Sequence, residues 1–325
     1  MTFKKKHIAV FLMVLAQVIS VSGCAKSHSL DQEVNTEAKI EVKTEEPSFD
    51  DNIIENAAVS YLGPQGTYTE EAAQFFFVDA KEFMPEASVD EAIEDIINGE
   101  ADYAVIPQEN TLGGAVTNYV DALISQENVY VVGEVVLPIR QTLMGISGAT
   151  LEDIQTVCSH AQGIVQTEEW RNENIPNAQV QEMESTAAAA KYVAESGDKT
   201  IAAVAAPGAA ELYGLSVLAE NVQITEANKT RFYVLSTSKP SAGSGTRTVF
   251  VATCEANKID DIIISLHDAG MELVTIHDRP EGSMLGKYNY IIEIESESGI
   301  TDGMQKVIEE VDELQYKGSF QVVEK

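Results

Sequence analysis

Apolar and polar positions along residues 57–240 alternate between short apolar runs and longer mixed segments. The apolar runs are typical of buried strands and comprise Ala57–Leu62, Tyr103–Pro107, Val129–Val136, Thr156–Ser159 and Ile201–Ala205. The mixed segments predict helices, among them Val89–Asn98, Gln162–Trp170 and Ala187–Ala194. Strands that alternate with helices indicate an α/β fold whose sheet is rich in parallel pairs.

Capping residues mark where these helices begin and end. Thr69 is expected to cap the helix that follows the first Gly/Pro turn. Ser88 begins the next helix and Gly99 stops it. Farther along, Ser185 or Thr186 caps the alanine-rich helix. Several helix starts therefore carry hydroxyl side chains beside free backbone N–H groups.

A second pattern begins after a Pro/Ser/Gly linker at Lys239–Gly245. Six segments follow in the order strand, helix, strand, strand, helix, strand: Thr246–Thr253, Ile259–Ala269, Leu273–His277, Tyr288–Glu295, Met304–Leu314 and Tyr316–Val323. This βαββαβ order is that of a ferredoxin-like domain, which we place at residues 246–325.

The N-terminal residues have the composition of an export signal. Lys4–Lys6 precede an apolar run from Ile8 to Val21, which ends in Ser22-Gly23-Cys24. The Val-Ser-Gly-Cys sequence resembles a bacterial lipoprotein box, so residues 1–24 predict a lipoprotein signal peptide with Cys24 as the lipidated residue. A plain signal peptide or an N-terminal membrane anchor is the alternative. Residues 25–56 are acidic and lack sustained periodicity, which predicts a flexible tether.

The net charge of the 325-residue chain is −31, which argues against nucleic-acid partners and against binding to acidic membrane surfaces. A site for an anion must therefore be built locally, from a few arginines and from helix N-termini. Cys158 and Cys254 fall in different predicted domains, so we expect buried free thiols. The chain has no His/Cys spacing for a metal, no phosphate-binding loop and no dinucleotide fingerprint.

Polar motifs occur where predicted strands end or helices begin. They are Gln65-Gly66-Thr67, Glu109-Asn110-Thr111, Ser159-His160, Ser185-Thr186 and Thr230-Arg231. Open α/β sheets bind ligands at the carboxyl edge of their strands, so these motifs are candidates for one shared site. Taken singly, each motif is a weak signal, and Thr230-Arg231 alone is better explained as an ordinary strand start with a surface ion pair.

Together the motifs resemble the prephenate dehydratase family. The resemblance rests on Tyr61–Thr69, Val105–Asn110, Ser159–Gln162, Glu184–Ala188 and Thr230-Arg231-Phe232, in the family's order. It covers about residues 57–240 and implies a two-lobed domain built like a periplasmic binding protein, with the site between the lobes. Residues 246–325 are similar to the family's ACT regulatory domain. The implied reaction is the decarboxylating dehydration of prephenate, a dianion, to phenylpyruvate in phenylalanine biosynthesis, without metal or cofactor.

The resemblance assigns roles at the Thr-Arg-Phe motif. Thr230 is expected to donate a hydrogen bond to the departing oxygen, because a threonine hydroxyl is too weak an acid to do more. Arg231 is a carboxylate anchor or an organiser of the site, and Phe232 shapes an apolar wall. Glu109 is either an acid of raised pKa in a dry cleft or merely a carboxylate near a helix. Together with Glu109, Asn110 matches a Glu-Asn pair of the family, so Asn110 is expected to contact the substrate.

The other candidate positions differ in how well a role in the site explains them. Ser159 and Gln162 are expected to contact the substrate, whereas His160 is better explained as a hydrogen-bonded histidine at a strand end. Ser185 and Thr186 bind a carboxylate, cap a helix, or do both. Arg140 is more simply a surface arginine than a second cation of the site.

The resemblance also bears on regulation and on a rival function. ACT domains of the family pair their sheets, so a homodimer through residues 246–325 is expected. His277-Asp278 stands where the family has Glu-Ser, and the Gly-Ala-Leu turn is replaced around Asn257–Ile259, so phenylalanine should bind weakly or not at all. We expect an extracytoplasmic enzyme held to the membrane through Cys24. The rival is a non-catalytic two-lobed lipoprotein that binds an aromatic or dicarboxylate solute.

Overall fold

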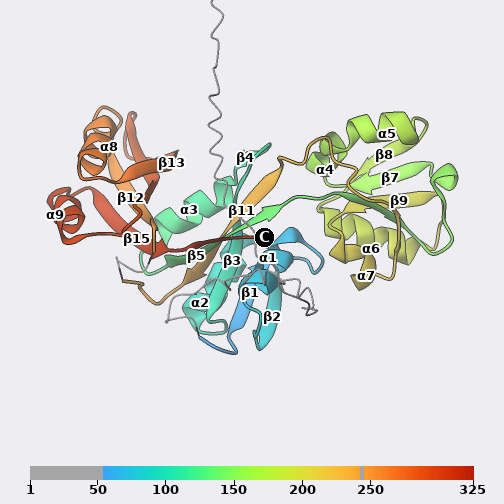
Figure 1. Cartoon of the computed structure of the whole chain (residues 1–325), viewed down its shortest axis with the longest axis horizontal. Coiled ribbons are helices and arrows are strands. Elements are labelled where there is room, and N and C mark those ends of the chain that lie inside the picture. Colours follow the sequence, from blue (N-terminus) through green and yellow to red (C-terminus); the bar gives the residue numbers. More distant parts are fainter. Residues whose placement is uncertain (1–53, 242–244) are drawn as a thin grey trace, which may run out of the picture. The chain divides into compact units, whose positions relative to one another are not determined.

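The structure of the protein is a computed structural model that describes residues 54–241 and 245–325. The signal peptide, Cys24 and the part of the predicted tether before Ile54 lie outside the described residues. The described strands form three sheets (Figure 1). Within these residues, no helix is both long enough and apolar enough to cross a membrane.

The first lobe contains the largest sheet. Its strands are β1 (Ala58–Leu62), β2 (Glu82–Glu86), β3 (Tyr103–Asn110), β4 (Gly114–Ala115), β5 (Tyr130–Pro138), β11 (Lys229–Ser236) and β16 (Val322–Glu324). Its helices are α1 (Tyr68–Phe76), α2 (Val89–Asn98) and α3 (Thr117–Ser125). The strand order is β16-β5-β11-β3-β1-β2, with β4 paired to β3. The strand that carries the Thr-Arg-Phe motif, β11, therefore lies in the middle of this sheet.

The second lobe contains a five-stranded sheet. Its strands are β6 (Thr142–Gly145), β7 (Thr156–Ser159), β8 (Gln179–Glu182), β9 (Ile201–Ala205) and β10 (Ser216–Ala219), in the order β10-β6-β9-β7-β8. Its helices are α4 (Ala161–Gln166), α5 (Glu168–Asn174), α6 (Thr186–Ser196) and α7 (Gly208–Leu212), and a 3-10 turn covers Leu151–Asp153.

Both sheets are mixed rather than mainly parallel. β1 pairs in parallel with β2 and β3, but β11 is antiparallel to β3 and β5. In the second lobe β7 is parallel to β8 and β9, whereas β6 is antiparallel to β9 and β10. The chain passes from β5 to β6 and from β10 to β11 between the lobes, without the helical crossover that a parallel return within one sheet requires. The expectation of a parallel-rich sheet missed these two crossings.

Several helix boundaries differ from the prediction, including the helix expected over Met304–Leu314, which is α9 (Asp302–Glu310). Thr67, not Thr69, caps α1, because its Oγ accepts the backbone N–H of Glu70 over 3.3 Å. The helix predicted over Gln162–Trp170 is broken at Thr167, whose hydroxyl donates to the Gly163 carbonyl over 2.7 Å. That local bond competes with helix continuation. The caps at Ser88 and Gly99 are confirmed, with Gly99 in the left-handed region at φ +76°.

The C-terminal region, residues 245–325, has the predicted βαββαβ order. Its elements are β12 (Arg247–Glu255), α8 (Ile259–Asp268), β13 (Glu272–Pro280), β14 (Lys287–Glu295), α9 (Asp302–Glu310) and β15 (Leu314–Phe320). The sheet order β13-β14-β12-β15 is that of a ferredoxin-like fold. The prediction that one last strand covers Tyr316–Val323 is wrong, because β15 ends at Phe320 and β16 pairs in parallel with β5 of the first lobe (Figure 1).

The C-terminal region is packed directly onto the first lobe. Gly318 of β15 has φ +142°, and a side chain there would meet the backbone oxygen of Val131 in β5 at 2.0 Å. Only glycine allows the two backbones to approach so closely. Val249, Ile291 and Phe320 then share a hydrophobic core with buried residues of the first lobe, such as Tyr233. Elsewhere, Cys158 and Cys254 are buried and free, as the sequence predicted.

Candidate active site

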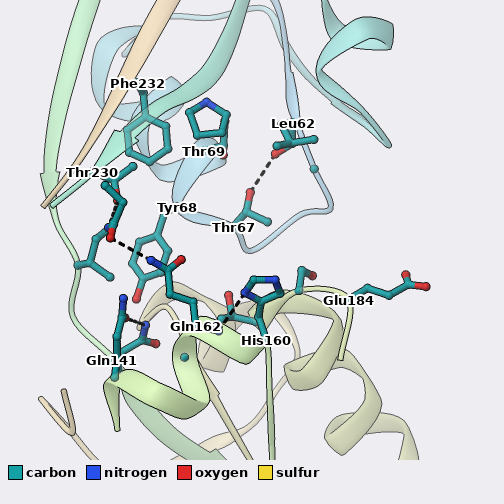
Figure 2. Close-up of a pocket in the computed structure, with 18 residues that line it drawn as sticks. Leu62, Thr67, Tyr68, Thr69, Gln141, His160, Gln162, Glu184, Thr230 and Phe232 are labelled. Atoms are coloured by element: carbon teal, nitrogen blue, oxygen red, sulfur yellow. Dashed lines mark hydrogen bonds between the residues drawn. The ribbon is translucent and has the colours of Figure 1, made fainter. Parts of the chain in front are cut away.

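A pocket of about 270 Å³ is lined by residues of both lobes (Figure 2). The first lobe supplies Leu62, Gly63, Thr67, Tyr68, Thr69, Pro107, Asn110, Thr230 and Phe232. The passage to the second lobe supplies Ile139 and Gln141, and the second lobe itself supplies His160, Gln162, Gly163, Gln166, Glu184, Ser185 and Thr186. The volume is near the lower end of the range for small-molecule sites, about 300 Å³. The pocket therefore suits a compact ligand surrounded mainly by neutral polar groups, with Glu184 as a carboxylate in the lining.

Thr230 and Asn110 form the polar centre of the first lobe's wall. The Asn110 Nδ2 donates to the Thr230 hydroxyl over 2.8 Å and to Asn228 Oδ1 over 2.9 Å. Asn110 Oδ1 accepts the backbone N–H groups of Leu112 and Gly113 over 3.0 and 2.9 Å. These partners fix the orientation of the amide, so the Thr230 oxygen is an acceptor toward Asn110. Its single hydrogen remains for another partner.

Gln162, on α4 of the second lobe, reaches the same amide. Its Nε2 donates to Asn110 Oδ1 over 3.0 Å, which links the two lobes across the pocket (Figure 2). A side chain at Gly113 would lie 2.6 Å from Gln162 Nε2, so this approach depends on glycine. A second link between the lobes joins the Tyr213 hydroxyl to the Gln65 carbonyl over 2.7 Å. The structure thus holds the lobes in contact around the pocket.

Two helix N-termini face the pocket from opposite lobes. α1 begins beside Thr67, and α6 begins beside Ser185, whose Oγ accepts the Ala188 N–H over 2.9 Å. Unpaired N–H groups at helix starts attract anions. Among the described residues, none that lines this pocket is a lysine or an arginine. Carboxylates would therefore be held by helix starts and hydroxyls, including that of Thr186.

Arg231 and Glu109 lie outside the pocket. Because side chains alternate along β11, Thr230 and Phe232 line the pocket while Arg231 points to the opposite face of the sheet. There Arg231 Nε and Nη2 contact Glu134 over 2.8 and 2.5 Å, and Nη1 contacts Glu109 over 3.3 Å. The anchor interpretation of Arg231 therefore lacks the required geometry, and the interpretation as a site organiser remains.

Burial shifts the pKa values of the charged groups on this opposite face of the sheet. Burial lowers the pKa of Arg231, but the carboxylates of Glu134 and Glu293 raise it by a larger amount. The pKa of Arg231 therefore lies above its usual value. Burial raises the pKa of Glu134, and the hydrogen bond from Arg231 opposes that rise. Burial likewise raises the pKa of Tyr233, assisted by the charge of Glu293. Arg231 is thus a permanent cation held by carboxylates of the protein itself.

Of the remaining predicted residues, some line the pocket and others lie outside it. Ser159 is fully buried and its hydroxyl donates to the Val204 carbonyl over 2.8 Å, so it supports the second lobe rather than lining the pocket. His160 lines the pocket and caps α4, with Nδ1 accepting the Gln162 N–H. Arg140 is exposed and does not line the pocket, as expected of a surface arginine.

The sequence interpretation missed an amide pair in the pocket wall. Gln141 Nε2 donates to Gln166 Oε1 over 3.0 Å, and both side chains are almost fully buried. The residues come from different segments of the chain, so no local pattern could pair them. The one available signal was the polar Gln141 directly before the short strand β6. Tyr68 and Glu184 also line the pocket; both lie in motifs matched to the family, but neither was assigned a role.

Comparison with known proteins gives a consistent result. The model of the prephenate dehydratase family matches residues 59–240. The bifunctional chorismate mutase/prephenate dehydratase of Neisseria gonorrhoeae is 35% identical over 239 residues, which are 73% of this chain and 66% of that protein. The prephenate dehydratase of Lactococcus lactis subsp. cremoris is 34% identical over 245 residues, which are 73% of this chain and 86% of that protein. The crystal structure of prephenate dehydratase from Arthrobacter aurescens in complex with L-phenylalanine superposes with a TM-score of 0.73 at 29% identity, covering 81% of this chain and 89% of that one.

Proposed function

The chain belongs to the prephenate dehydratase family, and we propose that the pocket between its lobes is the site where it converts prephenate to phenylpyruvate. In this reaction the bond to the ring carboxylate breaks and releases CO2. The electron pair enters the ring, and the ring hydroxyl leaves from the opposite carbon. With one added proton the departing hydroxide becomes water, and the ring becomes aromatic.

The observation that carries this proposal is the hydrogen-bonding state of Thr230. Its oxygen accepts from Asn110, and its hydroxyl lies in the pocket wall beside the apolar ring of Phe232. A hydroxyl oriented in this way is a preorganised donor for an oxygen on which negative charge develops. Thr230 thus stabilises the departing hydroxide without transferring its own proton.

The rest of the pocket matches the other parts of prephenate. Its two carboxylates need separate anion sites, and the pocket offers one helix start in each lobe, at Thr67–Thr69 and at Ser185-Thr186. Apolar side chains of Leu62, Pro107 and Phe232 provide surfaces for the carbon ring. Asn110 orients Thr230, and Gln162 holds Asn110 from the second lobe. Glu109 acts from the far face of the sheet, through Arg231.

We also propose where in the cell the enzyme acts, on the basis of its N-terminal residues. The basic and apolar leader and the Val21–Cys24 box support export followed by lipidation of Cys24. In this proposal the acidic tether over residues 25–56 holds the folded lobes away from the membrane. Replacement of Cys24 by serine should abolish incorporation of a fatty-acid analogue; unchanged incorporation would contradict the anchor.

Assembly and regulation concern the ferredoxin-like region. A homodimer through residues 246–325 is supported by the resemblance of this region to ACT domains. The Arthrobacter relative was solved with L-phenylalanine, but in this chain His277 and Arg279 contact the first lobe. The His277 and Tyr119 ring centroids lie 6.0 Å apart, and Arg279 pairs with Asp121. We therefore expect weak phenylalanine binding at most.

The direct test of the proposed function is to incubate the purified folded protein with prephenate and to follow phenylpyruvate formation. Turnover that depends on the Thr230 hydroxyl supports the proposal. Ligand binding without turnover would support the solute-binding alternative.

A further inference from the structure

The side chain of Glu293, on β14 of the C-terminal region, inserts its carboxylate beneath the strand that carries Thr230. The side chain is fully buried. Its Oε1 accepts from Arg231 Nη2 over 2.5 Å and from Arg247 Nη1 over 2.6 Å, and its Oε2 accepts from the Tyr233 hydroxyl over 2.6 Å. Two of these donors, Arg231 and Tyr233, belong to β11. The carboxylate therefore bridges the ferredoxin-like sheet and the central strand of the first lobe.

Arg231 also contacts the two strands that flank β11. Its guanidinium contacts Glu134 on β5 and Glu109 on β3, in addition to Glu293. Glu109 directly precedes Asn110, which orients the Thr230 hydroxyl. One guanidinium thus joins the strands on both sides of β11 to a carboxylate from the C-terminal region.

The backbone near these contacts is irregular. The pairing of β11 with β3 shifts register between Arg231 and Phe232, so β3 has one extra residue there, Gln108. At a bulge the ladder is disrupted and the bulged strand, here β3, bends, so the backbone pairing between β3 and β11 is interrupted at this point. Arg231 and Tyr233 stand on either side of Phe232 at this shift, so their bonds to Glu293 fall where the backbone ladder is interrupted.

We infer that Glu293 is a positioning residue of the catalytic site: by holding Arg231 and Tyr233 it fixes β11 so that the Thr230 hydroxyl points at the leaving oxygen. The kinetic part of this inference rests on the proposed function. The ferredoxin-like region then completes the dehydratase site in the same chain, in addition to any role in binding a regulator. A cluster that only joined two parts of the chain would add stability and leave the geometry of Thr230 unchanged.

The test compares two substitutions at the same junction in the full-length protein. Glu293→Gln keeps the size of the side chain but removes the charge that pairs with Arg231. Arg279→Gln is the matched control, because it breaks the bidentate pair of Arg279 with Asp121, at 2.6 and 2.7 Å, without touching β11. We expect Glu293→Gln to lower kcat about tenfold or more with KM changed less than about twofold, because a small misplacement of a catalytic group affects the transition state most. Arg279→Gln should keep kcat within about twofold of the parent.

A second readout does not require turnover. In protein labelled at threonine methyl groups, the Thr230 signal is identified by its absence in Thr230→Ser. The signal should move in Glu293→Gln and stay in place in Arg279→Gln. If the parent turns over prephenate and Glu293→Gln has parental kcat and an unmoved Thr230 signal, the positioning role is wrong while the proposed function stands. If the parent shows no turnover, the methyl signal alone decides the positioning role.

Tyr233→Phe covers the case in which Glu293→Gln does not fold. It removes the hydroxyl that donates to Glu293 Oε2 and accepts from Gln108 Nε2 over 3.4 Å, and it leaves every charge in place. We expect a fall in kcat of about threefold and a smaller displacement of the Thr230 methyl signal in the same direction. A folded Tyr233→Phe protein with neither change would overturn the inference.

Discussion

The side-chain amide of Asn110 donates to the hydroxyl of Thr230 over 2.8 Å. Because Asn110 Oδ1 is already bonded to backbone N–H groups at Leu112 and Gly113, the amide cannot rotate to exchange its oxygen and nitrogen. The Thr230 oxygen is therefore held as an acceptor, and its hydrogen is available to a ligand in the pocket. This relationship gives a weakly acidic hydroxyl a fixed role as hydrogen-bond donor.

Replacing Asn110 with aspartate should reverse this relationship. A carboxylate accepts the Thr230 hydrogen instead of donating to the oxygen, so the hydroxyl is no longer free to stabilise the departing hydroxide. We expect kcat for prephenate to fall by about a hundredfold, the scale of losing one preorganised donor. Asn174→Asp, which changes an exposed helix-end amide bonded to the Trp170 carbonyl, serves as the matched control. Parental kcat in Asn110→Asp would mean that Asn110 does not orient Thr230.

The bond between the lobes from Gln162 to Asn110 predicts a non-additive pair of substitutions. Gln162→Ala removes the bond, and Gly113→Ala places a methyl group 2.6 Å from Gln162 Nε2 and displaces it. Each should lower kcat/KM about tenfold, and the double variant should be no worse than the poorer single one. Gly208→Ala is the control, because a side chain there meets no atom within 4 Å. Fully additive losses would show that the two changes act independently.

Lys317 on β15 predicts a pH dependence of stability. The side chain is fully buried and its Nζ donates to the carbonyl of Gln126 over 2.5 Å. Burial lowers the pKa of Lys317 to about 8, from an ordinary value of 10.5. Between these values the unfolded chain keeps a proton that the folded chain has released, so this group's contribution to the free energy of unfolding rises with pH.

The prediction is tested by urea unfolding near pH 7.5 and pH 9.5, with Lys317→Met as the reference. Relative to this variant, the parent should gain about 2 kcal/mol in free energy of unfolding across that interval. The comparison cancels the titration of groups common to both proteins. An equal pH dependence in the two proteins would show that Lys317 keeps an ordinary pKa.

Phenylalanine binding is predicted to be weak. His277 packs edge-on against Tyr119, and Arg279 is held by Asp121. These two side chains of the His-Asp-Arg-Pro segment therefore contact α3. Titration calorimetry should give no dissociation constant in the micromolar range. The Arthrobacter relative, solved with L-phenylalanine, is the positive control. A micromolar affinity in this chain would contradict the prediction.

Much of the fold followed from local patterns. The strand at Thr156–Ser159, the cap at Ser88 and the C-terminal βαββαβ order were all predicted, because each depends on residues close together in the sequence. The break of the last strand after Phe320 was missed. Beyond Phe320 the chain pairs with β5, close to where Gly318 approaches the Val131 backbone, and both contacts join segments far apart in the chain.

The candidate site was predictable to a similar extent. Motif order brought Asn110, Gln162 and Thr230 together correctly, since all three line the pocket. The interpretation of Arg231 as an anchor overlooked strand alternation, which already places it on the face opposite Thr230. The partnership of Arg231 with Glu293 depends on packing across 62 residues of sequence and had no local signal.

The measurement that tests the account most directly is prephenate turnover by the parent protein, Thr230→Ala and Thr230→Ser, with substrate binding measured in parallel. If Thr230 donates mainly to the departing oxygen, Thr230→Ala should lower kcat by about a hundredfold or more with little change in binding. Thr230→Ser keeps the hydroxyl and should retain much of the activity. A parent that forms phenylpyruvate while Thr230→Ala stays fully active would contradict the role of Thr230. A parent that binds prephenate without forming phenylpyruvate would contradict the enzymatic function itself.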